Sequence, residues 1–167
     1  EGDKRFSYWI IAPSAGYSPY IPIKYDHYNI VGEDYQSSFR TGEVYISLAE
    51  AYARKENPEI GKVLGYLNTL RSHRIKPYTD LNSGDFASTD ALIKFVWEER
   101  RRELCFEEHH RWWDLRRTGQ PALSHAWVGG EVYKLKEKDP AYVINFPQLE
   151  REFNSTLNNA RPIRLPE

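Results

Sequence analysis

The chain has 167 residues, and its 23 lysines and arginines nearly balance its 24 aspartates and glutamates, which gives a formal net charge of −1. A chain of this length forms one ordinary core or part of a larger one. The balanced charge gives no global electrostatic reason to expect nucleic acid or an anionic membrane as a partner. No apolar run approaches the roughly 20 residues that a membrane-spanning helix needs, and the single cysteine, Cys105, cannot form an internal disulfide.

Residues 1–37 are predicted to form an aromatic-rich loop region. Pro13, Pro19 and Pro22 leave no helical period, and only a short strand is expected around residues 8–11. An irregular segment of this length is unusual in a self-contained domain. It therefore indicates either a functional loop or a segment separated from its natural neighbours.

Residues 38–75 are predicted to form a helical hairpin. Apolar residues recur at helical spacing over about 39–55, and Asn57-Pro58 suits the start of a second helix. So short a turn makes the two helices antiparallel, and the pattern resembles a single tetratricopeptide-type hairpin. Gly61 and Gly65 lie in the second helix, where we expect them to admit the close approach of another backbone.

Residues 89–118 are predicted to form one long charged helix, capped by the cluster Ser88-Thr89-Asp90 and ended by Gly119. On a helical wheel, several of its arginines and glutamates fall within the apolar stripe, so they would be partly buried. Buried charges must be paired. We therefore expect a structural ion-pair ladder that holds this helix against its neighbours, made of Arg100, Glu103, Glu107 and Arg111.

Three functional alternatives remain for the same stretch. Glu107 and His110 form a Glu-x-x-His of the kind found in carboxylate-bundle iron sites, but the sequence has no second copy. Glu107 and Glu108 are adjacent and point in different directions on a helix, unlike the paired carboxylates of acid/base catalysis. Arginine clusters interleaved with tryptophans suit nucleic acid, but interspersed carboxylates oppose this. We therefore predict no catalytic residue, no metal site and no cofactor.

Residues 119–167 are predicted to form an extended tail with capping turns, in which Gly129-Gly130 fits either a hairpin or an ordered loop. The expected fold class is all-α, mainly helical with long irregular loops. It combines a tetratricopeptide-like hairpin with a long buried helix.

The order of four segments resembles the SusD/RagB family. Residues 39–52 are similar to its Arg-x-x-Glu-x-x-x-x-x-Ala-Glu-Ala helix, and residues 67–74 to its Ile-Asn-x-Val-Arg-x-Arg helix end. Residues 98–117 are similar to its Glu-Arg-x-x-Glu-Leu-x-Phe-Glu-Gly and Arg-Trp-x-Asp-Leu-x-Arg block. Residues 146–159 resemble its closing Ile-Pro-x-x-Glu and Asn-Pro-x-Leu-x-Gln-Asn. The chain departs from these motifs with Gly42 inside the first helix and with Glu108, where glycine is usual.

This resemblance implies a non-enzymatic, lipid-anchored receptor on the cell surface of Bacteroidetes. Such a receptor binds glycans or other nutrients for import by a TonB-dependent outer-membrane transporter. The chain would correspond to the C-terminal part of a SusD-like fold, and we expect the family's lipidated N-terminal cysteine to lie outside it. The alternative is a protein-interaction scaffold that contacts the transporter without binding sugar itself.

The family motifs do not mark the ligand site, so the candidate ligand-binding residues are loop aromatics that no periodic core demands. Amphipathic rings of this kind suit contact with sugars, although plain burial of each ring stays open as the alternative. The candidates are Trp9, Tyr17, Tyr20, Tyr25, Tyr28, Trp127 and Tyr133.

Overall fold

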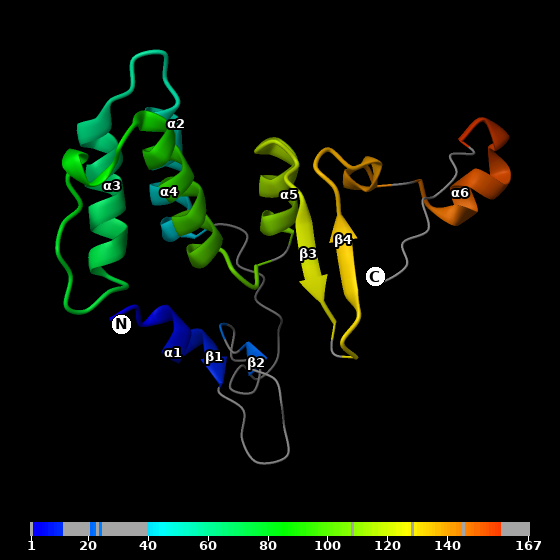
Figure 1. Ribbon diagram of the computed structural model, residues 1–167, viewed down its shortest axis with the longest axis horizontal. Coiled ribbons are helices and arrows are strands. Elements are labelled where there is room, and N and C mark those ends of the chain that lie inside the picture. Colours follow the sequence, from blue (N-terminus) through cyan, green and yellow to red (C-terminus); the bar gives the residue numbers. More distant parts are fainter. Residues whose placement is uncertain are drawn as a thin grey trace. The chain divides into compact units, whose positions relative to one another are not determined.

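The computed structural model describes residues 2–11, 21–22, 24, 40–107, 109–127, 129–144 and 146–157. The chain divides into two compact units, Glu1–Glu108 and His109–Glu167. It is mainly helical (Figure 1), which confirms the helical part of the predicted fold class.

The first unit begins with a short helix and an antiparallel pair of two-residue strands, namely α1 (Arg5–Trp9), β1 (Ile10–Ile11) and β2 (Ile21–Pro22). A short 3-10 helix and three longer α-helices follow, namely α2 (Thr41–Ala53), α3 (Ile60–Ser72), η1 (Ser83–Asp85) and α4 (Thr89–Glu103). The strand expected around residues 8–11 is therefore confined to β1, and the sequence does not predict α1.

The core of the first unit lies where α2 packs against both α3 and α4 (Figure 1). Each helix buries apolar side chains that recur every three or four residues, the spacing that places them on one face. Ala49 and Ala53 have small side chains, so they allow α2 a close approach to its neighbours. The fully or nearly fully buried apolar residues are Ile46, Ala49, Ala53, Val63, Leu67, Leu70, Leu92 and Val96.

The helix starts agree with the sequence prediction at one place and differ at another. The Ser88 hydroxyl accepts a hydrogen bond of 3.1 Å from the backbone N–H of Ala91, so the predicted cap of α4 is confirmed. Helix α3, in contrast, begins at Ile60 with Glu59 in the N-cap position, and not at Asn57-Pro58. Glu59 forms ion pairs with Lys55 and Lys62 across this turn.

The single helix predicted over 89–118 is two helices in the structure. Helix α4 ends at Glu103, and α5 (His110–Arg117) begins a new helix after it. Phe106 has a φ of +62°, outside the right-handed helical region. Lys24 Nζ donates to the carbonyl oxygens of Glu103 (2.5 Å) and Cys105 (3.1 Å). In a continuous helix these carbonyls would accept bonds from residues four positions later, so the lysine replaces helical hydrogen bonds.

The second unit contains α5, an antiparallel hairpin and a short C-terminal helix. The hairpin pairs β3 (Leu123–Ala126) with β4 (Val132–Leu135), as the Gly129-Gly130 pair allowed. The remaining elements are η2 (Pro140–Tyr142), α6 (Gln148–Phe153) and η3 (Ser155–Leu157). Helix α5 ends just before Gly119, which has a φ of +102°, so the predicted stop is confirmed.

Tyr142 is the buried centre of the second unit. Its ring stacks on Trp112 with centroids 5.1 Å apart, and its hydroxyl donates a 2.5 Å hydrogen bond to the carbonyl of Pro121. Burial raises the pKa of the Tyr142 hydroxyl, which therefore stays a hydrogen-bond donor. This residue joins α5, the start of the hairpin and η2.

Among the residues that the structure describes, no helix combines the length and the apolar character needed to cross a membrane.

The expectation that Gly61 and Gly65 admit a neighbouring backbone is wrong for the described part of the chain. A Cβ added at either glycine would meet no atom within 4 Å.

We therefore expect Gly65→Ala to raise the free energy of unfolding by about 0.5–1 kcal/mol, because alanine loses less backbone entropy in a helix. Urea denaturation of the two proteins measures the difference, and a loss of stability would show that another part of the protein contacts this position.

Candidate functional site

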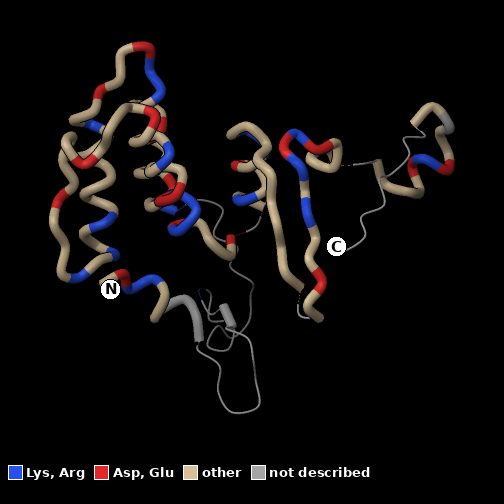
Figure 2. The backbone as a smooth tube through the Cα atoms, in the orientation of Figure 1, with Lys and Arg blue, Asp and Glu red and all other residues tan. Residues whose placement is uncertain are grey.

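Charged residues concentrate along the last turns of α4 (Figure 2). Glu99 and Glu103 lie one turn apart on this helix with 0% of their surface exposed, and Glu107 is buried just beyond its end. A buried carboxylate is costly unless cations and hydrogen bonds compensate it. The surrounding side chains must therefore supply positive charge.

Three arginines from different segments neutralise Glu99. Arg5 Nη1 lies 2.6 Å from Glu99 Oε1, and Arg102 on the next helical turn lies 3.3 Å from Oε2. Arg71, from the last turn of α3, also donates to Oε2. Arg5 is itself held by Asp3, with Nη2 2.6 Å from Oδ2. Glu99 thus joins the N-terminal segment to α3 and α4.

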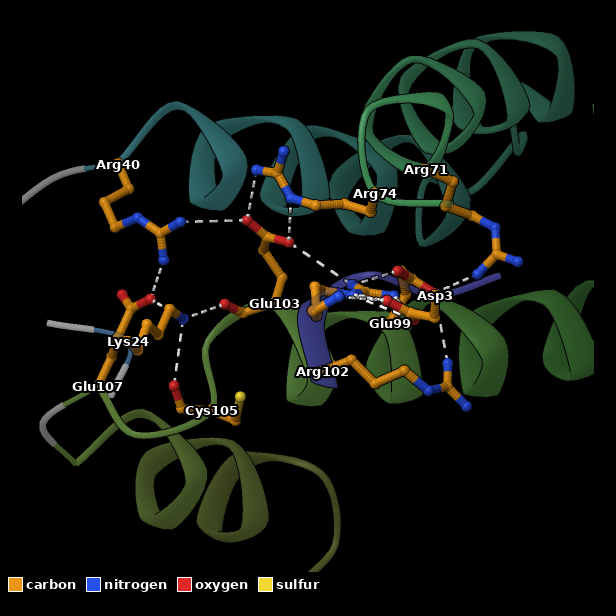
Figure 3. A network of polar contacts seen from close by, with 11 residues as sticks. Asp3, Lys24, Arg40, Arg71, Arg74, Glu99, Arg102, Glu103, Cys105 and Glu107 are labelled. Atoms are coloured by element: carbon orange, nitrogen blue, oxygen red, sulfur yellow. Dashed lines mark hydrogen bonds and ion pairs between the residues drawn. The ribbon is translucent and has the colours of Figure 1, made fainter. Parts of the chain in front are cut away.

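Glu103 is held mainly by Arg74, which follows α3. The guanidinium donates through Nε at 3.0 Å and through Nη2 at 2.8 Å to the two carboxylate oxygens, the bidentate geometry that arginine favours (Figure 3). Arg40, which precedes α2, lies 3.4 Å from the same carboxylate, and Arg5 lies 3.5 Å from it. Glu103 therefore connects the N-terminal segment and the ends of two other helices to α4.

Glu107 pairs with Arg40 and with Lys24 (Figure 3). The Lys24 ammonium also caps the end of α4 through the two backbone carbonyls described above. Burial lowers the pKa of Lys24, although the nearby Glu107 carboxylate opposes this shift. The same ammonium thus fixes both the end of the helix and the carboxylate that follows it.

The pKa values of the N-terminal pair follow from this network. Burial disfavours the charged forms of both Asp3 and Arg5, but the hydrogen bonds and opposite charges between them outweigh burial. The pKa of Asp3 is therefore lowered and the pKa of Arg5 is raised. Both groups stay charged at neutral pH.

The four residues predicted to form a ladder have different surroundings. Glu103 and Glu107 both contact Arg40, whereas Arg100 donates to Ser47 Oγ (2.9 Å) and Glu43 (3.4 Å) on α2. Arg111 lies on α5 in the second unit and is exposed. Apart from Arg102, which lies three residues from Glu99, the cations that hold the buried glutamates are not predicted from the sequence. They are Arg5, Lys24, Arg40, Arg71 and Arg74, and each lies 28 or more positions from the glutamate that it contacts, so helical spacing gives no signal for them.

The network depends on Gly42 in α2. A Cβ at this position would lie 3.0 Å from Cδ of Glu103 and closer still to its Oε1 oxygen. Any larger residue would displace a carboxylate that is fully buried and paired. The glycine that interrupts the helical pattern is therefore required by the packing of α2 against α4.

The second candidate feature is an aromatic face on the β3–β4 hairpin. Trp127 and Tyr133 are 59% and 38% exposed. His125 pairs directly with Tyr133, and Trp127 N donates a 2.8 Å hydrogen bond to Glu131 O. Because paired residues share a face and alternate residues return to it, the two aromatic rings and His125 lie on one side of the hairpin. The rings of His125 and Trp127 are in contact, with centroids 6.2 Å apart.

The other predicted ligand residues are not placed. Trp9 is the last residue of α1, but its side chain is outside the described set. Tyr17, Tyr20, Tyr25 and Tyr28 also lie outside the described residues. Within the described part of the chain, no group of three or more histidine, cysteine, aspartate or glutamate side chains could hold a metal ion.

Comparison with known families gives a match over nearly the whole chain. The model of the SusD family matches residues 3–166. The chain belongs to the SusD family. No curated protein and no solved structure matched the chain. Proteins of the SusD family bind nutrients, glycans among them, at the cell surface, and the family is one of binding proteins rather than enzymes.

In this SusD-family chain, we expect Gly42→Ala to lower the free energy of unfolding by about 1–3 kcal/mol, the usual range for overpacking a core. The added methyl group would push the Glu103 carboxylate away from its arginines. Urea denaturation measures the loss, and Gly65→Ala is the matched control because its methyl group meets open space. Equal behaviour of the two variants would contradict the assigned role of Gly42.

Burial raises the pKa of the Cys105 thiol, which opposing charges from Lys24 and Arg5 offset only in part. We therefore expect its alkylation by iodoacetamide to reach half-maximal rate at a higher pH in the folded protein than in the urea-unfolded chain. The thiol is the only one in the sequence, so the rate reports it alone. Because the folded state holds the proton more tightly, this group's contribution to stability is present below the unfolded pKa and lost as pH rises through the folded pKa. Coincident profiles would show that the thiol is not buried.

Proposed function

We propose that the protein captures oligosaccharides at the bacterial cell surface, without cleaving them, for import by a TonB-dependent outer-membrane transporter. The proposal follows from membership of the SusD family together with one structural observation, the exposed aromatic face of the β3–β4 hairpin. In this proposal a lipid anchor holds the protein at the outer membrane.

The hairpin face has the properties that a sugar-binding surface needs. Trp127 and Tyr133 each present a broad apolar ring to solvent, onto which the C–H face of a pyranose can stack, and each carries a polar group that can hydrogen bond. The imidazole of His125 adds a further donor or acceptor between them. His125 and Tyr133 lie on paired strands, which hold side chains more rigidly than a loop would, and Trp127 directly follows β3. Together they form a small aromatic platform rimmed by hydrogen-bonding groups.

The same face supports binding without cleavage. Canonical glycosidases use two carboxylates on either side of the scissile bond. From Leu123 to Leu135 the sequence contains one carboxylate, Glu131, which stands opposite Trp127. The buried carboxylates of the first unit are engaged by arginines and lysine. A receptor function agrees with this distribution of acids better than a hydrolase function does.

A second function is favoured by a separate observation. Residues 143–153 expose an unusual number of apolar side chains, and such clusters commonly mark protein contacts. In this alternative the protein is a scaffold that contacts the transporter and leaves sugar binding to others. The exposed residues are Val143, Ile144, Phe146, Leu149 and Phe153.

Isothermal titration of the full-length protein with maltoheptaose, cellohexaose, xylohexaose and laminarihexaose tests the glycan proposal. We expect Trp127→Ala and Tyr133→Ala each to weaken binding of the preferred glycan by about tenfold or more, the loss typical of a central aromatic contact. Phe153→Ala is the control, because this ring is 85% exposed but lies on α6 and outside the hairpin. Absence of glycan binding, combined with co-purification of a transporter, would favour the scaffold function instead.

A further inference from the structure

A pocket of about 490 Å³ opens on the first unit, between the N-terminal segment and the end of α4. Its volume lies within the range of small-molecule sites, roughly 300–1,000 Å³. It is separate from the aromatic face of the hairpin, which belongs to the second unit. The lining residues that matter here are Phe6, Glu98, Arg101, Arg102, Cys105 and Phe106.

Two phenylalanines give the pocket an apolar wall. Phe6 on α1 is 57% exposed, and Phe106 after α4 is 51% exposed. Phe106 also has the left-handed φ of +62°, which is strongly disfavoured for a bulky residue. Neither burial of the ring nor backbone preference explains a phenylalanine here. A residue kept in such a conformation is a reason to consider a binding role.

The charged side chains that line the pocket differ in how firmly they are held in ion pairs. Asp3 is bound by Arg5, and both Arg5 and Arg102 contact the buried Glu99, so these groups are committed to the network (Figure 3). Arg101 differs, because its ion pair with Glu98 is 3.9 Å long and both side chains are more than half exposed. Such a pair contributes little and is easily exchanged. Arg101 is therefore the lining charge best able to turn to a ligand.

We propose that this pocket binds a small organic anion with a flat apolar body. The body packs against Phe6 and Phe106, and the anionic group pairs with Arg101 in place of Glu98. Arg5 and Arg102 also line the pocket but are neutralised by Glu99 and Asp3, so the preference for an anion rests on Arg101. Occupancy would cover Cys105, whose thiol reports it.

Titration calorimetry with 2-naphthoate tests the proposal, using neutral 2-naphthamide and cationic 2-naphthylmethylammonium as matched probes. We expect naphthoate to bind at least about tenfold more tightly than either, since one ionic contact in a partly dry site commonly gives that factor. Bound naphthoate should also slow the alkylation of Cys105 by iodoacetamide. Equal or tighter binding of the amide or the ammonium, or no binding of naphthoate, would overturn the proposal.

Two variants localise the site. Arg101→Gln should reduce naphthoate affinity by about tenfold and bring it to the level of the amide, whereas Arg116→Gln, at an exposed position of α5, should leave it unchanged. Phe106→Gly should weaken binding while the urea midpoint stays the same or rises, because glycine prefers the backbone conformation found there. If Phe106→Gly does not fold, the affinity of Arg101→Gln for naphthoate decides whether the pocket is the binding site. Unchanged naphthoate affinity in Arg101→Gln, or in folded Phe106→Gly, would refute the assignment.

Discussion

Two carboxylates without any solvent exposure, Glu99 and Glu103, impose the strongest constraint on the first unit. Removing one partner from a buried ion pair typically costs about 3–5 kcal/mol, because the remaining charge stays buried without compensation. The cations that prevent this come from the N-terminal segment, from the residue before α2 and from the end of α3. These segments can therefore pack only in arrangements that bring their arginines to α4. The ionic network specifies how these segments are arranged, whereas burial of the apolar core supplies the favourable free energy of packing.

Helix α4 divides these two roles along its length. Its first half contributes Leu92 and Val96 to the apolar core, and its last two turns carry the buried carboxylates of Glu99 and Glu103. The network also ends the helix, since Lys24 binds both Glu107 and the last carbonyls. The chain then turns through Phe106 in a left-handed conformation, which places that ring at the surface and forms one wall of the pocket. The end of α4 therefore holds the buried charges and also contributes one wall of the pocket.

The sequence predicts the positions and ends of helices where these depend on residues close together in the chain. Helical periodicity located α2 and α3, Ser88 marked the start of α4, and Gly119 marked the end of α5. The break between α4 and α5 escaped prediction because its cause, Lys24, lies 79 positions from Glu103. Arg5 and Arg40 were not predicted as partners of α4 because they too lie far from it in the sequence. Trp127 and Tyr133 were candidates as aromatics outside a periodic core, but their common face depends on the register of the hairpin, which composition does not reveal.

The stretch that carries most of the family pattern is also the one that carries the buried charges. Arg71, Arg74, Glu99, Glu103 and Glu107 all fall within the SusD-like motifs, and each is engaged in the network. Changing any of them would disturb the packing of several segments at once. Trp127, Tyr133, Phe6 and Arg101 contact solvent and contribute little to either core, so they can change with small effects on folding. The family match in this protein therefore reflects the residues that hold the fold together. Ligand preference depends instead on the side chains that the fold leaves exposed.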